Sequence, residues 1–123
     1  MSNNKPFRFG DRIKSFKFAI EGVISFFKTE HNAWIHCVAA VAVVCAGFIL
    51  KIDKYEWCWI IISIALVFIF EMINTAIEII CDVVSPEINP QIKRIKDIAA
   101  GAVLVASLAA VAIGLIIFVP KLI

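Results

Sequence analysis

The sequence predicts an all-α integral membrane protein: a single domain over residues 1–123, with an N-terminal amphipathic surface helix and three transmembrane helices. Of its residues, 62% are hydrophobic, whereas a soluble domain of this length has about half. Three long segments are nearly free of charge, and a helix of about 20 apolar residues crosses the hydrocarbon core of a bilayer. The net charge is only +2, so bulk charge does not indicate a nucleic-acid partner.

The first predicted element is a surface helix over about residues 7–28. Its apolar side chains recur at intervals of three and four, which places them on one face of a helix. These apolar residues are Phe9, Ile13, Phe16, Ile20, Val23 and Phe27. Basic side chains occupy much of the remainder, and a basic amphipathic helix next to a membrane span most simply lies in the interface. This helix is either an anchor or a part of the substrate site.

Three spans are expected, at about residues 34–52, 57–84 and 98–120. The first is almost free of charged residues and the third has none. The charge-free start of the second reaches only to Phe70, which is too short to cross a bilayer, so this helix must continue through Glu71. The third also carries a four-residue repeat of small residues, which allows close packing against a helix of the same chain or of a second copy. The repeat is Ala102, Ala106, Ala110 and Gly114.

The distribution of lysine and arginine predicts the orientation in the membrane. Nine basic residues precede the first span or follow the second, and three lie on the other side. The nine are Lys5, Arg8, Arg12, Lys14, Lys17, Lys28, Lys93, Arg94 and Lys96, and the three are Lys51, Lys54 and Lys121. Because short cytoplasmic segments are enriched in basic residues, the N-terminus and the expected loop from Asp82 to Asp97 are placed in the cytoplasm.

The second predicted span carries a line of polar side chains in its cytoplasmic half, where the sequence reads EMINTAIEIICD. At about 100° per residue, Glu71, Asn74, Glu78 and Asp82 share an arc of roughly 80°. Glu71 is expected inside the inner leaflet and Asp82 beyond the membrane boundary. An ionisable group at that depth costs at least a few kcal/mol and normally faces a partner or a cavity. The line is therefore either a binding site or a set of groups satisfied by neighbouring helices.

The residue types favour a metal and a phosphate. Carboxylates on one helix face repel one another unless a cation lies among them, and carboxylate oxygens suit Mg²⁺. Glu30 before the first span, and Lys96 with Asp97 before the third, are expected at the same boundary as Glu78. A metal, a lysine for phosphate and a buried base are what phosphoryl transfer uses. The chain has neither a Walker A motif nor the glycine-rich loop of protein kinases.

The line of polar residues is also part of a longer pattern. The motif ExxN[ST]AIExxxD followed by KDxxxxAV, present here as EMINTAIEIICD and KDIAAGAV, resembles the small prokaryotic diacylglycerol kinase family, which includes the undecaprenol kinases. The resemblance covers nearly the whole chain. It implies a homotrimeric helical bundle in the bacterial inner membrane, with active sites shared between subunits at the cytoplasmic interface. It further implies ATP as co-substrate, Mg²⁺ as cofactor and a lipid alcohol as acceptor.

The resemblance implies a role for each matching residue. Glu71 would be the catalytic base for the lipid hydroxyl, Glu30 and Glu78 would hold the metal, and Asn74 would shape the site. The residues expected to bind ATP are Lys96, Asp97, Asp82, Phe18, Glu87 and Asn89. The residues expected to contact the lipid substrate are Asn32, Trp34, His36 and Ala100.

Several alternatives stay open on the sequence. Phe18 and Ile88 stand where some family members carry tyrosine, so recognition of the adenine base is expected to differ in detail. The acceptor is undecaprenol or diacylglycerol, and the segment SPEINPQIKRIKDIAAGAVL is more similar to the undecaprenol kinase branch. Outside this family, the acidic line could belong to a small oligomeric cation or proton channel or to a non-catalytic membrane scaffold. A channel needs polar groups through the full membrane depth, whereas the outer halves of these spans are apolar.

Overall fold

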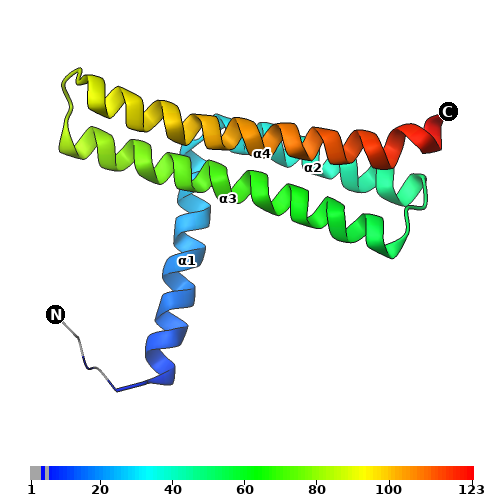
Figure 1. Ribbon diagram of the computed structural model, residues 1–123. Helices are drawn as coiled ribbons and strands as arrows, with labels where there is room; N and C mark the ends of the chain where they lie inside the picture. The colour runs from blue at the N-terminus through cyan, green and yellow to red at the C-terminus, as the bar shows by residue number, and fades with distance from the viewer. Residues whose placement is uncertain (1–3, 5) are drawn as a thin grey trace.

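The computed structural model describes residue 4 and residues 6–123, and this part of the chain forms helices without any strand. The helices are α1 (Phe9–Thr29), α2 (His31–Ile49), α3 (Lys54–Val84) and α4 (Pro90–Leu122). The last three run side by side as an antiparallel bundle, and α1 leaves the bundle at a steep angle (Figure 1). The predicted all-α fold is confirmed. Lys5, one of the basic residues counted above, lies outside the described residues.

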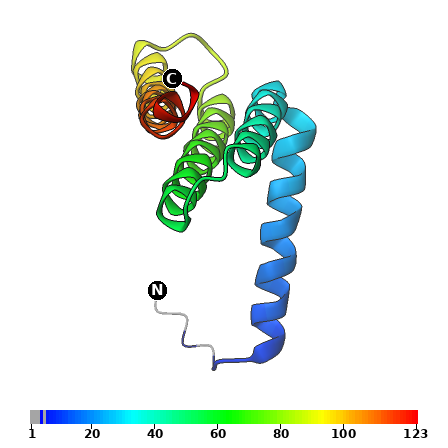
Figure 2. The same ribbon diagram turned by 90° about the vertical axis from the view of Figure 1, so that its right-hand side faces the viewer.

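Helices α2, α3 and α4 each have the length and hydropathy to cross a membrane. Helix α3, which is the middle span in the sequence, also lies in the middle of the bundle, between α2 and α4 (Figure 2). It runs unbroken through Glu71, as its short charge-free start requires. Many large apolar side chains of these helices are exposed in the single chain. Soluble proteins rarely leave that much apolar surface uncovered, which agrees with insertion into a membrane.

The N-terminus of α3 has a complete capping box. The Asp53 carboxylate accepts hydrogen bonds of 2.9 Å from the backbone N–H groups of Tyr55 and Glu56, and the Glu56 carboxylate accepts one of 3.1 Å from the Asp53 N–H. These bonds satisfy donors that a helix start leaves free. The hydrogen bond from the Glu56 N–H is the main cause that lowers the pKa of Asp53. Lys121 near the end of α4 lies 3.2 Å from Glu56, so α3 and α4 are joined at the predicted outer face.

The same end of the bundle holds a small apolar core. Ile52, in the turn between α2 and α3, packs with Ile60 of α3 and Ile117 of α4. Gly47 of α2 is buried beneath the indole ring of Trp57, and a Cβ added at Gly47 would lie 2.7 Å from the Trp57 Cη2 atom. Real Cβ atoms do not approach a ring so closely. A glycine is therefore required for α2 and the start of α3 to pack at this distance.

The structure corrects the sequence prediction at the predicted cytoplasmic end of the bundle. Helix α3 ends at Val84, as predicted, but the segment from there to Asp97, expected to be a loop, is helical from Pro90 onward, where α4 begins. The Asn89 side chain accepts a 2.9 Å hydrogen bond from the Gln91 N–H. An asparagine cap followed by a proline in the first turn is a strong start signal for a helix. Lys96 is therefore on a helix rather than in a loop.

Helices α1 and α2 are separated by one extended residue, Glu30, with φ −107° and ψ 114°. The chain turns sharply there (Figure 1). The Phe27 ring lies 5.6 Å from the ring of Trp34 and 5.9 Å from that of Phe68. The Trp34 indole N–H also donates a 2.8 Å hydrogen bond to the Phe27 carbonyl. These contacts hold the junction against α3 close to Glu71, which follows Phe68 by one turn.

Candidate active site

Glu71 is the most deeply buried carboxylate of the polar line. Its side chain is only 8% exposed, and its Oε1 atom lies 2.8 Å from the Nε2 atom of His36. His36 belongs to α2, so Glu71 is partnered by another helix and not by its own. Within the described residues, His36 is the one side chain hydrogen-bonded to Glu71. The sequence prediction placed His36 against the lipid, and its pairing with Glu71 was missed.

Further along α3, Asn74 and Glu78 form a second polar level. The Asn74 Nδ2 atom donates a 3.3 Å hydrogen bond to the Glu78 Oε1 atom. The Asn74 Oδ1 atom is buried, and no donor in the described part of the chain reaches it. Thr75 is buried as well. This threonine was not among the predicted site residues, although its spacing of four residues from Glu71 places both on one helix face.

The third level lies at the predicted cytoplasmic end and contains two ion pairs. The Lys96 ammonium lies 2.7 Å from the Asp82 carboxylate, which links α4 to α3, and Lys93 lies 2.6 Å from Asp97 within α4. Lys96 precedes the apolar part of α4, outside the predicted span. Its hydrogen bond to Asp82 raises the pKa of Lys96. Exposed ion pairs of this kind contribute little to the free energy of folding. Their role is instead to present charged groups at this end of the bundle.

A pocket of about 280 Å³ lies among the end of α3, the connecting residues and the start of α4. We call it the cytoplasmic pocket, after the orientation predicted from the sequence. It is lined by Asp82, Ser85, Pro86, Glu87, Ile88, Asn89, Ile92, Lys93 and Lys96. Four of the residues expected to bind ATP are thus brought together. Lys93, which was not among the predicted site residues, adds a second ammonium group. A pocket with two lysines at a membrane boundary is suited to phosphate.

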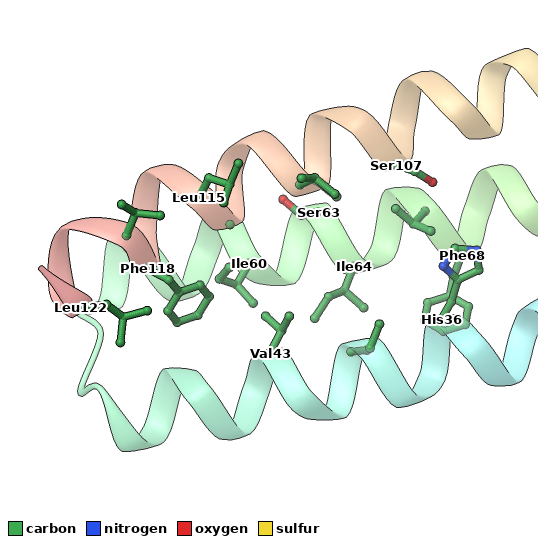
Figure 3. A pocket seen from close by; sticks show the side chains of 17 residues that line it. His36, Val43, Ile60, Ser63, Ile64, Phe68, Ser107, Leu115, Phe118 and Leu122 are labelled. Atoms are coloured by element: carbon green, nitrogen blue, oxygen red, sulfur yellow. The ribbon is translucent and has the colours of Figure 1, made fainter.

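An apolar groove of about 490 Å³, which was not predicted from the sequence, lies between α2, α3 and α4. His36 and Phe68 line one end, and Leu122 lines the other (Figure 3). Ser63 and Ser107 are its remaining polar side chains, and the Ser63 hydroxyl donates to the Trp59 carbonyl. The groove therefore extends from the partner of Glu71 toward the predicted outer face, and its walls are those of a hydrocarbon site.

The two expected metal ligands, Glu30 and Glu78, do not belong to a larger cluster of metal-binding side chains in the described part of the chain. Glu30 lies half-buried at the junction of α1 and α2, and Glu78 lies half-buried on α3. Among the residues that the structure describes, no three His, Cys, Asp or Glu side chains are close enough to hold a metal ion by themselves. A metal held here would need further ligands from substrate or water.

The remaining predicted contacts lie at the surface of the single chain. Phe18 is exposed on α1 and is not part of the cytoplasmic pocket, and Asn32 and Ala100 are exposed on α2 and α4. The Trp34 ring is exposed, but its N–H group is used by the Phe27 carbonyl.

Fold and site together define a small helical membrane protein that presents carboxylates and lysines at one membrane boundary. The family model described as prokaryotic diacylglycerol kinase matches residues 17–118. The chain belongs to this family, and it is therefore a lipid kinase.

Curated relatives support the assignment. The undecaprenol kinase of Bacillus subtilis is 41% identical over 109 residues, which cover 89% of either chain. The diacylglycerol kinase of Synechocystis sp. is 37% identical over 109 residues, covering 88% of this chain and 62% of the relative. The diacylglycerol kinase of Haemophilus influenzae is 31% identical over 94 residues, covering 76% and 80%. These relatives are named for two different acceptors, so their names do not decide between undecaprenol and diacylglycerol.

Proposed function

We propose that the protein transfers the γ-phosphoryl group of ATP to the hydroxyl group of undecaprenol, with Mg²⁺, at the cytoplasmic face of the bacterial inner membrane. The observation that carries this proposal is the position of Glu71. Its partner His36 lines the apolar groove, and the polar line on α3 leads from Glu71 to the cytoplasmic pocket. A lipid hydroxyl can thus approach from the groove, and a nucleotide phosphate from the cytoplasm.

Glu71 acts as the base. It accepts the hydroxyl proton while the lipid oxygen bonds to the γ-phosphorus and the bond between that phosphorus and ADP breaks. Its burial keeps bulk water away from the reacting hydroxyl, which limits transfer of the phosphoryl group to water. A hydrogen-bonded carboxylate on a long helix is also held at a constant depth, where a lipid headgroup arrives.

The nucleotide occupies the cytoplasmic pocket. Lys96 contacts the phosphates, and Asp82 holds its ammonium group in the free protein. Asp97 helps to hold the nucleotide together with Glu87 and Asn89. Phe18 is proposed as a further contact to the nucleotide. The positive charges of the lysines stabilise the negative charge that develops on the transferring phosphoryl group.

The residues present fit a magnesium ion. Mg²⁺ takes one or two protein carboxylates and completes its octahedron with phosphate oxygens and water, so Glu30 and Glu78 suffice without a three-ligand cluster. The buried Asn74 Oδ1 atom is an oxygen acceptor that lacks a donor from the described residues, as expected next to a cation or its water. When bound, Mg²⁺ neutralises phosphate charge.

Undecaprenol is proposed as the acceptor because few hydrogen-bond donors are available near Glu71. Diacylglycerol brings two ester groups next to its hydroxyl, and these favour donors near Glu71. Among the expected lipid contacts, Trp34 donates to Phe27, His36 is engaged with Glu71 and Ala100 has no side-chain donor. This leaves Asn32, exposed at the start of α2, as the remaining side-chain donor of that set. A polyprenol carries one hydroxyl and no ester, so it leaves no polar group unpaired in this site. The 41% identity to a relative named undecaprenol kinase also supports this choice.

The assembly is proposed as a homotrimer with shared active sites and a cytoplasmic N-terminus. The exposed apolar side chains of α2 and α4 provide surface for contacts with further copies. The steep angle between α1 and the bundle (Figure 1) lets α1 lie along the membrane when the bundle crosses it, with its basic residues toward anionic headgroups.

The test is a phosphorylation assay with the purified full chain in mixed micelles. Radiolabelled ATP and Mg²⁺ are supplied with undecaprenol or diacylglycerol at matched mole fraction. We expect kcat/KM to be higher for undecaprenol and activity to disappear when EDTA removes Mg²⁺. A preference of about tenfold or more for diacylglycerol would refute the acceptor assignment, while folded protein that phosphorylates neither lipid would refute the kinase proposal.

A further inference from the structure

We infer that His36 is a positioning residue for Glu71. It donates its Nε2–H to one carboxylate oxygen, Oε1, and so leaves the other, Oε2, free to accept the proton of the lipid hydroxyl. This inference rests on the proposed function, because it assigns a second residue to the base at the same site. It differs from the role expected from the sequence, in which His36 contacts the lipid itself.

The geometry singles out this pair. The His36 Nε2 atom lies 2.8 Å from the Glu71 Oε1 atom, and the two residues come from different helices. The His36 ring also packs edge-on against Phe68, with 6.2 Å between ring centroids and 73° between ring planes. Phe68 in turn contacts Phe27 of α1. The imidazole is thus held by an aromatic cluster and not only by its hydrogen bond.

Other polar groups near Glu71 do not perform this role. Asn74, one turn further on the same helix, donates to Glu78. Ser63, which lies two turns earlier, donates to a backbone carbonyl of its own helix. Within the described residues, the Glu71 carboxylate is therefore oriented by a single side-chain hydrogen-bond donor, which is His36.

The chemistry explains why one donor is needed. The two oxygens of a carboxylate are equivalent, and the terminal torsion of a glutamate is broad, so an unsupported group presents either oxygen to the substrate. A neutral imidazole has one N–H group and can hold one oxygen. It holds the carboxylate plane while the second oxygen accepts the proton. Positioning of this kind affects the rate of the chemical step more than the binding of either substrate.

The test compares two substitutions of His36. His36→Leu removes the donor, and His36→Gln keeps an N–H group at a similar reach. Because a hydrogen bond to a charged group is lost, we expect His36→Leu to lower kcat by about 10- to 100-fold, with the KM values for ATP and undecaprenol within about twofold of the wild type. His36→Gln should recover most of that loss.

A double variant provides the readout that a purely structural role would not give. If His36 acts through Glu71, then His36→Leu should cause no further loss in a protein that already carries Glu71→Gln. Independent losses that multiply would overturn the inference. So would a raised KM for undecaprenol at unchanged kcat, which would assign His36 to the lipid itself.

Two controls separate this inference from folding defects and from failure of the proposed function. Cys45→Ala alters an exposed residue of α2 and should leave kcat unchanged. If His36→Leu does not fold, the comparison of His36→Gln with His36→Asn tests the inference. The shorter asparagine cannot reach Glu71, so His36→Asn should lose the kcat that His36→Gln retains. Inactive folded wild type would refute the proposed function, whereas active wild type with an equally active His36→Leu would refute only the role of His36.

Discussion

The substitution Glu71→Gln gives the sharpest test of the catalytic assignment. Glutamine has the shape of glutamate and can accept a hydrogen bond from the His36 N–H through its amide oxygen, at the position where Oε1 now lies 2.8 Å away. The variant thus keeps the packing of α3 against α2. What it loses is the ability to accept a proton, which is the one property that the proposal requires of this residue.

The substitution is therefore expected to have a large effect on turnover and a small effect on folding stability. A general base contributes about 10²- to 10⁴-fold to the rate, which corresponds to about 3–5.5 kcal/mol of activation free energy. The exchange of a hydrogen bond to a charged group for one to a neutral group costs about 1–2 kcal/mol of folding free energy. Removal of a charge that is only 8% exposed offsets part of this cost. Turnover should therefore fall by at least a hundredfold while the melting temperature changes by a few degrees.

The assay measures kcat with saturating Mg-ATP and undecaprenol in mixed micelles, with nucleotide binding and thermal unfolding measured on the same preparation. Glu21→Gln is the matched control, because Glu21 is exposed on α1 and has no proposed role. A folded Glu71→Gln variant with kcat within about threefold of the wild type would show that Glu71 is not the base.

The remaining predictions concern the metal, the nucleotide and the outer end of the bundle. Glu30→Gln and Glu78→Gln should each raise the Mg²⁺ concentration needed for half-maximal activity, and an unchanged Mg²⁺ titration would exclude that residue as a ligand. Lys96→Met should raise the KM for ATP about tenfold or more, since a charge-assisted contact to phosphate is lost, and an unaltered KM would remove this lysine from the nucleotide site. Gly47→Ala should lower the melting temperature, because its Cβ would meet an indole carbon at 2.7 Å and overpacking costs about 1–3 kcal/mol. Gly22→Ala, where a Cβ meets nothing within 4 Å, is the control that should not do so.

The helices and their order could be predicted from local sequence. Apolar runs and their interruptions decide which residues cross the membrane, because lipid has no polar partner for an exposed charge or a bare peptide group. The continuation of α3 through Glu71 followed from length alone. The one clear error, the loop before the third span, came from its polar composition, although Asn89 and Pro90 carry a start signal for a helix.

The candidate site could be predicted only in part. The spacing along α3 placed Glu71, Asn74, Glu78 and Asp82 on one face, since their spacings of three and four residues are properties of any α-helix. The apolar groove was not predictable in the same way. Its walls come from three helices, and the volume among them depends on how far apart their axes lie.

By itself, the sequence determined the three apolar spans, the spacing of the polar line along its helix and the family to which its motif belongs, because these features are set by residues that are neighbours along the chain. Only the tertiary structure decided which groups meet. His36 and Glu71 are 35 residues apart, and Lys96 and Asp82 are 14 apart. Their contacts depend on the rotation and the register of each helix against the next. Those are fixed by the packing of side chains across the bundle, which no local pattern along one helix records.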